Sequence, residues 1–218
     1  MSPIGVFFDF DGVLVDSADY HYRTWSEAFE RLCGETIPEY RSRHLSGKAS
    51  LEVAAVIADL AGMSDRAQEL YELRLAVIAE SDDVPDAAPG AAAFTEELQR
   101  RSIPYAVVSN APSIYVQSVC RALGYTPERT FGVDDYGGRH KPDPWPYRCA
   151  MSQLGFSPRD RESLLVVEDS ATGVRSGAAA GIPVLGLSRG LDAEALFDAG
   201  ARHVVEDLRE VESVVSFG

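Results

Sequence analysis

Basic side chains are scarce in this sequence. Its 218 residues include 20 lysines and arginines against 34 aspartates and glutamates, which gives a formal net charge of -14. A chain of this charge repels nucleic-acid phosphates and anionic lipid surfaces, so we expect neither nucleic acid nor a membrane as a partner. Lysine itself occurs only twice, as Lys48 and Lys141, and the positions of these two residues therefore need an explanation.

The sequence is also poor in cysteine and in long hydrophobic runs. Its three cysteines, Cys33, Cys120 and Cys149, are far apart and have no CxxC spacing, which argues against a disulfide framework and a zinc site. We expect three reduced, mostly buried thiols. The first apolar run ends at Asp9, and no later stretch approaches the ~20 apolar residues of a membrane span. These features predict a cytoplasmic protein.

Short apolar runs alternate with helical patterns along the chain. Hydrophobic residues make up 45% and charged residues 25% of it, as in ordinary globular proteins. The runs are nearly continuous, which is typical of strands covered by helices on both faces. We therefore predict an α/β protein with a parallel sheet. The predicted strands are residues 4–8, 105–108, 164–167, 183–187 and 203–205.

A long helical insertion follows the first strand. About 95 residues separate the first two predicted strands, whereas a single crossover needs only a few dozen. Between Asp19 and Glu80 the apolar residues follow helical spacing, and no strand pattern is convincing. Residues 16–19 offer helix N-caps on entry, and the turn-forming residues 82–86 mark the exit. We predict a helical unit at residues 17–86.

Two acids follow the first predicted strand. In the stretch FFDFDGVLVD, Asp9 and Asp11 lie two residues apart where the strand ends. A carboxylate at that place is desolvated, which is costly unless it binds a cation or reacts, and parallel sheets place ligands at the carboxyl ends of their strands. For an isolated D-x-D pattern, a pair of turn or helix-capping aspartates is the ordinary interpretation.

Three further stretches place polar residues beside a strand end or a helix start. Ser109 and Asn110 follow the second strand and precede a proline, a pattern that gives either a helix cap or an anion site at a helix N-terminus. Lys141 lies in a proline-flanked loop, where a solvated lysine is the default. Glu168 and Asp169 follow a strand directly, and Asp169 alone could be an N-cap residue.

Together the four stretches bring carboxylates, a hydroxyl and a lysine to one edge of one sheet. These are the groups of a magnesium-assisted phosphoryl-transfer site. Carboxylate oxygens suit Mg²⁺, and no His/Cys cluster suggests zinc. The combination favours one catalytic site over four separate coincidences.

In order and spacing, the stretches FDFDGVLVDS, VVSNA, KPDP and VVEDSATGV resemble the four motifs of the haloacid dehalogenase-like hydrolases. The similarity is to the branch with a helical cap inserted after the first motif, and it covers essentially the whole chain. It implies a Rossmannoid α/β core of residues 1–16 and 87–218. It also implies an all-helical cap domain of residues 17–86 that closes over the site.

The resemblance assigns roles position by position. Asp9 would be the nucleophile that accepts the phosphoryl group, and Asp11 the general acid and base. Mg²⁺ would be held by Asp9, the backbone carbonyl of Asp11 and Asp169, with Glu168 assisting directly or through water. Lys141 would neutralise Asp9 and the transferring oxygens. True dehalogenases differ at the second aspartate, so Asp11 favours phosphoryl chemistry.

The residues that would contact the substrate are Ser109 and Asn110 at the phosphate, and others in the cap. His21 lies in a stretch similar to that of β-phosphoglucomutase, where a histidine sits near the acid/base aspartate; an ordinary surface histidine is the alternative. Gly47 and Lys48 look similar to a loop of the sugar and sugar-acid phosphatases, including those acting on 6-phosphogluconate. For Lys48 a solvated surface lysine remains the alternative.

The cap also bears on the choice between hydrolysis and isomerisation. A mutase of this family grips a second phosphate with an arginine and a lysine of the cap. Here the cations of residues 41–48 do not line up with that arginine, and residues 71–74 contain no lysine. We therefore predict a Mg²⁺-dependent phosphatase of a small sugar or sugar-acid phosphate, acting through an aspartyl-phosphate on Asp9, as a monomer or weak dimer.

Two rival functions remain open. The nearest is a β-phosphoglucomutase-like hexose-phosphate mutase. The other is a non-catalytic binding or regulatory protein on the same fold, because a fold alone does not imply a function. The intact set of acids argues against the second, since an idle site has no reason to keep costly carboxylates together.

Overall fold

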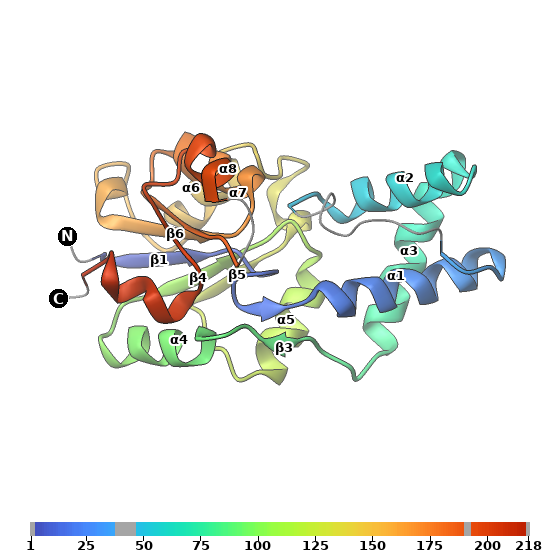
Figure 1. The fold of residues 1–218 in the computed structure, drawn as a ribbon, viewed down its shortest axis with the longest axis horizontal. Helices are drawn as coiled ribbons and strands as arrows, with labels where there is room; N and C mark the ends of the chain where they lie inside the picture. The colour runs from blue at the N-terminus through green and yellow to red at the C-terminus, as the bar shows by residue number, and fades with distance from the viewer. Residues whose placement is uncertain (1–2, 38–46, 190–192, 217–218) are drawn as a thin grey trace.

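A parallel six-stranded sheet forms the centre of the protein (Figure 1). The computed structural model describes residues 3–37, 47–189 and 193–216. The strand order is β5-β4-β1-β6-β7-β8, and every neighbouring pair is parallel, which confirms the predicted α/β class. The strands are β1 (Gly5–Phe8), β4 (Tyr105–Val108), β5 (Arg129–Phe131), β6 (Leu164–Glu168), β7 (Val184–Leu187) and β8 (His203–Val205).

Five of these six strands are the predicted ones, each within one residue of its expected bounds. The sixth, β5, was not predicted. It lies at the edge of the sheet beside β4, where Thr130 pairs with Val107. Only Phe131 of its three residues is buried, so β5 lacks the continuous apolar run by which the other strands can be recognised.

Helices cover both faces of the sheet, because alternate side chains of each strand point to opposite sides. Val6 and Phe8 of β1 pack in one apolar cluster with α4 (Ala91–Arg100) and α5 (Ser113–Ala122). Phe7 packs on the other side. That second cluster includes side chains of α6 (Trp145–Gln153), α7 (Ala171–Ala180) and α8 (Ala193–Ala199).

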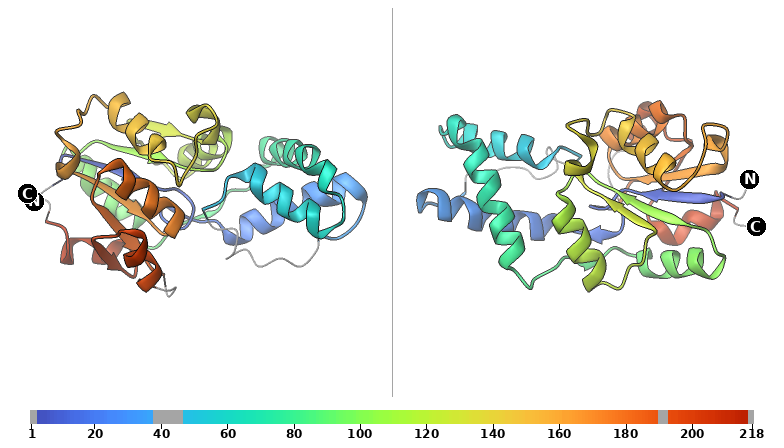
Figure 2. Two further views of the ribbon diagram at one scale, coloured as in Figure 1. Left: turned by 90° about the horizontal axis from the view of Figure 1, so that it is seen from above. Right: turned by 180° about the vertical axis from the view of Figure 1, so that it is seen from behind.

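Three further helices form a group of their own beyond the carboxyl ends of the strands (Figure 1). They are α1 (Ala18–Cys33), α2 (Ser50–Leu60) and α3 (Ala67–Glu80). Their shared apolar core includes Trp25, Phe29, Ile57, Leu70 and Val77. Both views in Figure 2 place these helices at one end of the molecule and the chain termini at the other. The helical character predicted for this part of the chain is confirmed.

A short antiparallel ribbon lies where the chain passes between the sheet and the three helices. β2 (Val15–Asp16) pairs there with β3 (Asp86–Ala87). Neither strand was predicted, because two residues are too few for a recognisable period. The N-cap of α1 is Ser17, within the predicted residues 16–19, although its side chain makes no capping hydrogen bond. The domain boundaries at 16/17 and 86/87 stay a prediction.

Short 3₁₀ helices complete the described chain. They are η2 (Ser64–Arg66), η3 (Val133–Tyr136), η4 (Arg161–Ser163) and η5 (Leu208–Ser213). All three cysteines are free, with Cys120 buried and the other two half-buried. Within the described ranges, no helix combines the length and apolarity that crossing a membrane demands.

The apolar core of the three helices generates a test of stability. Ile57 is 0% exposed, whereas Leu60 on the same helix is 56% exposed. We expect Ile57→Ala to lower the free energy of unfolding by about 2–5 kcal/mol, because it leaves a cavity in a packed core. Leu60→Ala should change it by less than about 0.5 kcal/mol. Urea denaturation of both variants measures the difference, and equal losses would contradict the packing described here.

Candidate active site

Lys141 lies at the centre of the candidate site, buried between the ends of three strands. Its Nζ donates to Asp9 Oδ1 at 2.7 Å, to Glu168 Oε1 at 2.6 Å and to the carbonyl oxygen of Val108 at 2.6 Å. An ammonium group has three N–H donors, so all of them are used. Burial lowers the pKa of Lys141, but the charges of Asp9 and Glu168 outweigh burial and raise this pKa above its usual value. The ammonium group therefore stays protonated.

Asp9, Glu168 and Asp169 form an acid cluster, in which one oxygen from each carboxylate lies within 4.8 Å of the others. Burial and the neighbouring Glu168 raise the pKa of Asp9 to about 7, although Lys141 lowers it. The pKa of Asp169 is raised well above its usual range by burial and by Asp9. One ammonium does not balance three carboxylates. The oxygen donors therefore fit a hard divalent cation such as Mg²⁺.

Two glycines leave room for these acids. Gly12, at φ +80°, is so close to the cluster that a Cβ there would lie 1.9 Å from Asp169 Oδ2. A Cβ on Gly173, in the first turn of α7, would lie 1.7 Å from Glu168 Oε1. A side chain at either position would displace a carboxylate, so the glycines of the first and fourth motifs are explained by close approach.

Glu168 is the most enclosed of the three acids, with 0% exposure. Besides Lys141, its Oε1 accepts a hydrogen bond from the Tyr147 hydroxyl at 2.7 Å, and its Oε2 accepts one from Ser170 at 3.2 Å. These contacts place Glu168 as a support for Lys141. Its assistance to a metal stays a prediction, as does the role of the Asp11 backbone carbonyl.

Asp11 lies beside the acid cluster but makes different contacts. Its Oδ1 accepts a hydrogen bond from the Tyr115 hydroxyl at 2.9 Å and lies 2.7 Å from His21 Nε2. Burial alone would raise the pKa of Asp11, but the His21 ring and the hydroxyls of Ser17 and Tyr115 lower it to about 2. The structure thus brings His21, a residue of the helical group, directly to the proposed acid/base.

Asn110 uses its side-chain amide on backbone groups. Its Nδ2 donates to the carbonyl oxygens of Gly47 at 2.8 Å and Lys141 at 3.2 Å, and its Oδ1 accepts from the backbone N–H of Lys141 at 3.0 Å. Ser109 Oγ accepts from the backbone N–H of Ala111, so its own hydroxyl proton can still be donated. Phosphate binding by Ser109 and Asn110 stays a prediction.

The capping alternatives raised by the sequence are wrong. α5 begins at Ser113 with Pro112 in the N-cap position, so neither Ser109 nor Asn110 caps it. At α7 the cap is Ser170, whose Oγ accepts from the backbone N–H of Gly173 at 3.0 Å. Asp169 is therefore left to the acid cluster.

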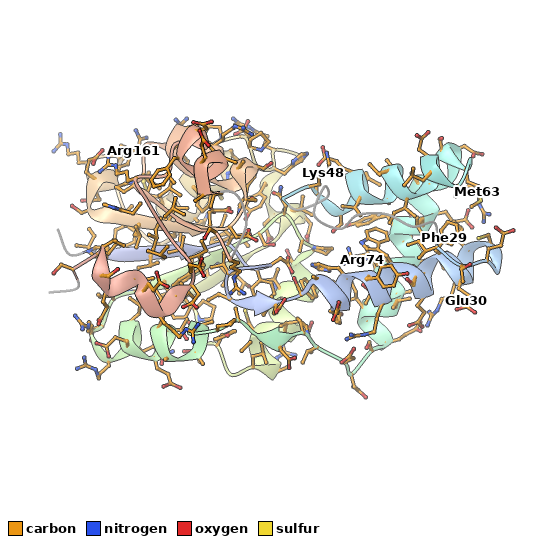
Figure 3. All side chains as sticks on the ribbon, in the orientation of Figure 1. Phe29, Glu30, Lys48, Met63, Arg74 and Arg161 are labelled. Atoms are coloured by element: carbon orange, nitrogen blue, oxygen red, sulfur yellow. The ribbon has the colours of Figure 1, made fainter. Side chains whose placement is uncertain are left out.

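A cavity of about 450 Å³ lies between the sheet edge and the helical group. Its walls include the predicted site residues other than Glu168: Asp9, Asp11, His21, Gly47, Lys48, Ser109, Asn110, Lys141 and Asp169. Figure 3 shows Lys48 and Arg74 at the end of the helical group that is nearer the sheet. Residues 41–46, considered above as a source of cations, lie outside the described residues.

Three contacts in the site were not predicted from the sequence. Tyr147 and Tyr115 donate to Glu168 and Asp11, respectively. Arg74 is 2% exposed, and its Nη2 lies 2.7 Å from His21 Nδ1. One signal was available, because Arg74 follows Leu70 by four residues on the buried stripe of α3, where a charged side chain needs a partner.

The chain is similar to known hydrolases and phosphatases. A family model described as haloacid dehalogenase-like hydrolase matches residues 5–181. Validoxylamine A 7'-phosphate phosphatase of Streptomyces hygroscopicus subsp. limoneus is 32% identical over 94% of this chain and 93% of its own. Hexitol phosphatase A of Escherichia coli K12 is 31% identical over 86% and 84%.

The fold has close counterparts among solved structures. A crystal structure described as a predicted phosphoglycolate phosphatase from Haemophilus somnus 129PT superposes with a TM-score of 0.81 at 19% identity, over 98% of both chains. At this identity the likeness concerns the fold alone.

The raised pKa of Asp9 predicts how the stability of the protein depends on pH. In the metal-free protein, the folded state keeps the Asp9 proton up to about pH 7, whereas an ordinary aspartate loses it near 3.8. The folded state therefore disfavours the charged form of Asp9. As pH rises through this window, the contribution of Asp9 to the free energy of unfolding falls. We expect Asp9→Asn to be more stable than the parent at pH 8, with a smaller difference at pH 4.

Urea denaturation in EDTA at pH 4, 6 and 8 measures this difference. EDTA is required because a bound cation would itself stabilise the ionised carboxylates. A difference between Asp9→Asn and the parent that does not change with pH would contradict the buried, charge-repelled environment of Asp9.

Proposed function

This chain belongs to the haloacid dehalogenase-like hydrolases, and we propose that it is a Mg²⁺-dependent phosphatase of a small sugar or sugar-acid phosphate. The observation that carries the proposal is the buried contact of Asp9 with Lys141 inside the acid cluster, at the wall of a cavity. The two relatives compared above are both named as phosphatases, one of hexitols and one of a validoxylamine phosphate.

In the first step, a carboxylate oxygen of Asp9 bonds to the phosphorus atom as the bond from phosphorus to the alcohol oxygen breaks. Asp11 gives its proton to the departing oxygen. The covalent aspartyl-phosphate divides one difficult displacement into two easier ones. Lys141 remains hydrogen-bonded to Asp9, where its charge offsets the negative charge that collects around the phosphoryl group.

In the second step, water attacks the phosphorus atom of the aspartyl-phosphate. Asp11, now ionised, takes a proton from the water as the bond to Asp9 breaks, and inorganic phosphate leaves. The low pKa of Asp11 favours the ionised form that the second step needs. A phosphate dianion bound beside it adds negative charge and raises that pKa toward the value that the first step needs.

The acid cluster would hold the metal through Asp9 and Asp169, with Glu168 and the backbone carbonyl of Asp11 completing the protein's share. When bound there, Mg²⁺ supplies positive charge that reduces the repulsion between carboxylates and phosphate. Asp9 and Asp169 both carry raised pKa values, as expected of acids that share a site without enough positive charge.

The cavity supports a small substrate rather than a macromolecular one. Its volume of about 450 Å³ lies in the range of small-molecule sites. Lys48 is exposed and lines it from the helical side, where it could contact the part of a sugar phosphate that does not react. Gly47 lies beside it and is tied to the sheet edge by Asn110.

Phosphate release is the direct test of this proposal. We expect the protein to release inorganic phosphate from members of a panel of sugar and sugar-acid phosphates with Mg²⁺, and to lose this activity in excess EDTA. Asp9→Asn should lower turnover by about 1,000-fold or more, because the amide is not a nucleophile. Asp65→Asn, at an exposed turn far from the sheet, is the matched control and should retain activity.

The outcome of this assay can also contradict the proposal. Full activity in EDTA would remove the metal from the mechanism. Appreciable phosphate release by Asp9→Asn would exclude the aspartyl-phosphate on Asp9.

The mutase alternative differs in the fate of the phosphoryl group. With β-glucose 1-phosphate and a bisphosphate activator, we expect little glucose 6-phosphate relative to hydrolysis of the preferred substrate. Coupled detection of glucose 6-phosphate measures the isomerisation, and a malachite green assay measures the phosphate. Efficient isomerisation would reverse the ranking of the two functions.

A further inference from the structure

Two side chains contact the same carboxylate oxygen of Asp11. The Tyr115 hydroxyl is 2.9 Å from Oδ1 and His21 Nε2 is 2.7 Å from the same atom. They come from different parts of the protein, since Tyr115 is on α5 against the sheet and His21 is on α1 of the helical group. Neither of these two donors contacts Oδ2. Ser17 is a further hydrogen-bond partner of this carboxylate, and the two Oδ1 contacts join it to both parts of the protein.

The protonation of the His21 ring follows from its second neighbour. Arg74 Nη2 lies 2.7 Å from His21 Nδ1. A guanidinium carries only donors, so Nδ1 must accept this hydrogen bond and the ring proton must be on Nε2. Nε2 is the atom that faces Asp11, so the tautomer that Arg74 requires is also the one that donates to Oδ1.

Arg74 is itself held in place by several contacts. Its Nε lies 3.3 Å from Thr24 Oγ1, its Nη1 lies 3.2 Å from Ser50 Oγ, and its guanidinium carbon lies 4.2 Å from the centre of the Trp25 ring. These partners belong to α1 and α2. An arginine of α3 that is held by contacts to two other helices can orient a ring with little freedom, which a solvated arginine cannot.

Tyr115 is fixed in a comparable way on the other side. Its side chain is 0% exposed and stacks on Tyr20 at 5.3 Å, while Phe10 meets it edge-on at 5.5 Å. Burial and the Asp11 charge raise the pKa of Tyr115 well above its usual value, so the hydroxyl keeps its proton and donates.

We propose that Arg74 and Tyr115 are positioning residues for Asp11. Arg74 acts through the tautomer of His21, and Tyr115 acts directly. Together they occupy Oδ1 and fix the orientation of the carboxylate that gives and takes the proton during the reaction. The inference rests on the proposed function, because the orientation of the carboxylate matters only where Asp11 exchanges a proton with substrate and water.

Tyr115→Phe is the first test, since it removes only the hydroxyl and keeps the packed ring. We expect kcat to fall about tenfold with KM within twofold of the parent, because a misplaced proton donor slows the chemical steps without weakening binding. Tyr125→Phe is the matched control: Tyr125 is also buried, and its hydroxyl donates to the carbonyl of Leu14 at 2.9 Å. It should leave kcat unchanged.

The kinetic outcomes separate a positioning role from a structural one. Equal losses in the two tyrosine variants would indicate a general effect of a lost buried hydrogen bond and would overturn the proposal for Tyr115. An unchanged kcat in Tyr115→Phe would overturn it as well. A rise in KM without a fall in kcat would place the hydroxyl in substrate binding instead.

Arg74 is tested by the tautomer of His21, read from ¹⁵N chemical shifts of the two ring nitrogens. The resonances are assigned by their loss in His21→Gln. We expect the Nε2–H tautomer in the parent and in Arg74→Lys, because lysine also carries only donors. Arg74→Met should shift the ring away from this single tautomer, because no donor then keeps Nδ1 unprotonated, and should show a lower kcat, with Arg74→Lys intermediate. The same tautomer and the same kcat in Arg74→Met would overturn the role of Arg74.

These experiments also distinguish the inference from the proposed function. If Arg74→Met does not fold, Arg74→Lys and Tyr115→Phe still decide the outcome, because each keeps most of the parent side chain. Absence of phosphate release by the parent protein from every substrate would overturn the proposed function, and with it the positioning role in catalysis. The ¹⁵N measurement needs no turnover, so it would still decide whether Arg74 sets the His21 tautomer.

Discussion

The ammonium group of Lys141 donates to acceptors at the ends of three neighbouring strands, β4, β1 and β6. Burying the carboxylates of Asp9 and Glu168 would be prohibitive without this cation, because each charge loses its hydration. The surrounding structure serves the same contact: Tyr147 satisfies Glu168 from α6, and Gly173 leaves the space in which that carboxylate lies. Removing the lysine would leave uncompensated charges inside the protein, so it is a condition of the fold as well as of the site.

The topology explains why residues so distant in sequence meet at this point. In a parallel sheet every strand ends at the same edge, and β1 lies between β4 and β6. Acids placed directly after β1 and at the end of β6 are therefore neighbours. The helical group leaves the sheet immediately after β1 and returns through the β2–β3 ribbon, which places its inner surface over the same edge. The cavity results from these two connections.

The strand ends and their acids could be predicted from the sequence because each depends on local patterns, namely a continuous apolar run followed by a carboxylate. β5 could not, since an edge strand has few buried residues. The contacts of Arg74 and Tyr115 could not either, because they depend on how α3 and α5 are placed around Asp11. A sequence pattern identifies the buried face of a helix, but not the residues of other elements that this face contacts. Asn110 shows the same limit, since its partners are backbone groups of Gly47 and Lys141.

Asp9 and Asp11 lie two residues apart, yet their environments shift their pKa values in opposite directions. Burial and Glu168 raise that of Asp9 to about 7, while His21, Ser17 and Tyr115 overcome burial and lower that of Asp11 to about 2. A bound cation would lower the pKa of Asp9 and so favour the ionised form that a nucleophile needs. The pKa of Asp11 depends on donors from both the sheet side and the helical group, so the environment of the proposed acid/base is formed only where the two parts meet. Separating two carboxylates by their surroundings is how one fold obtains two chemical roles from one residue type.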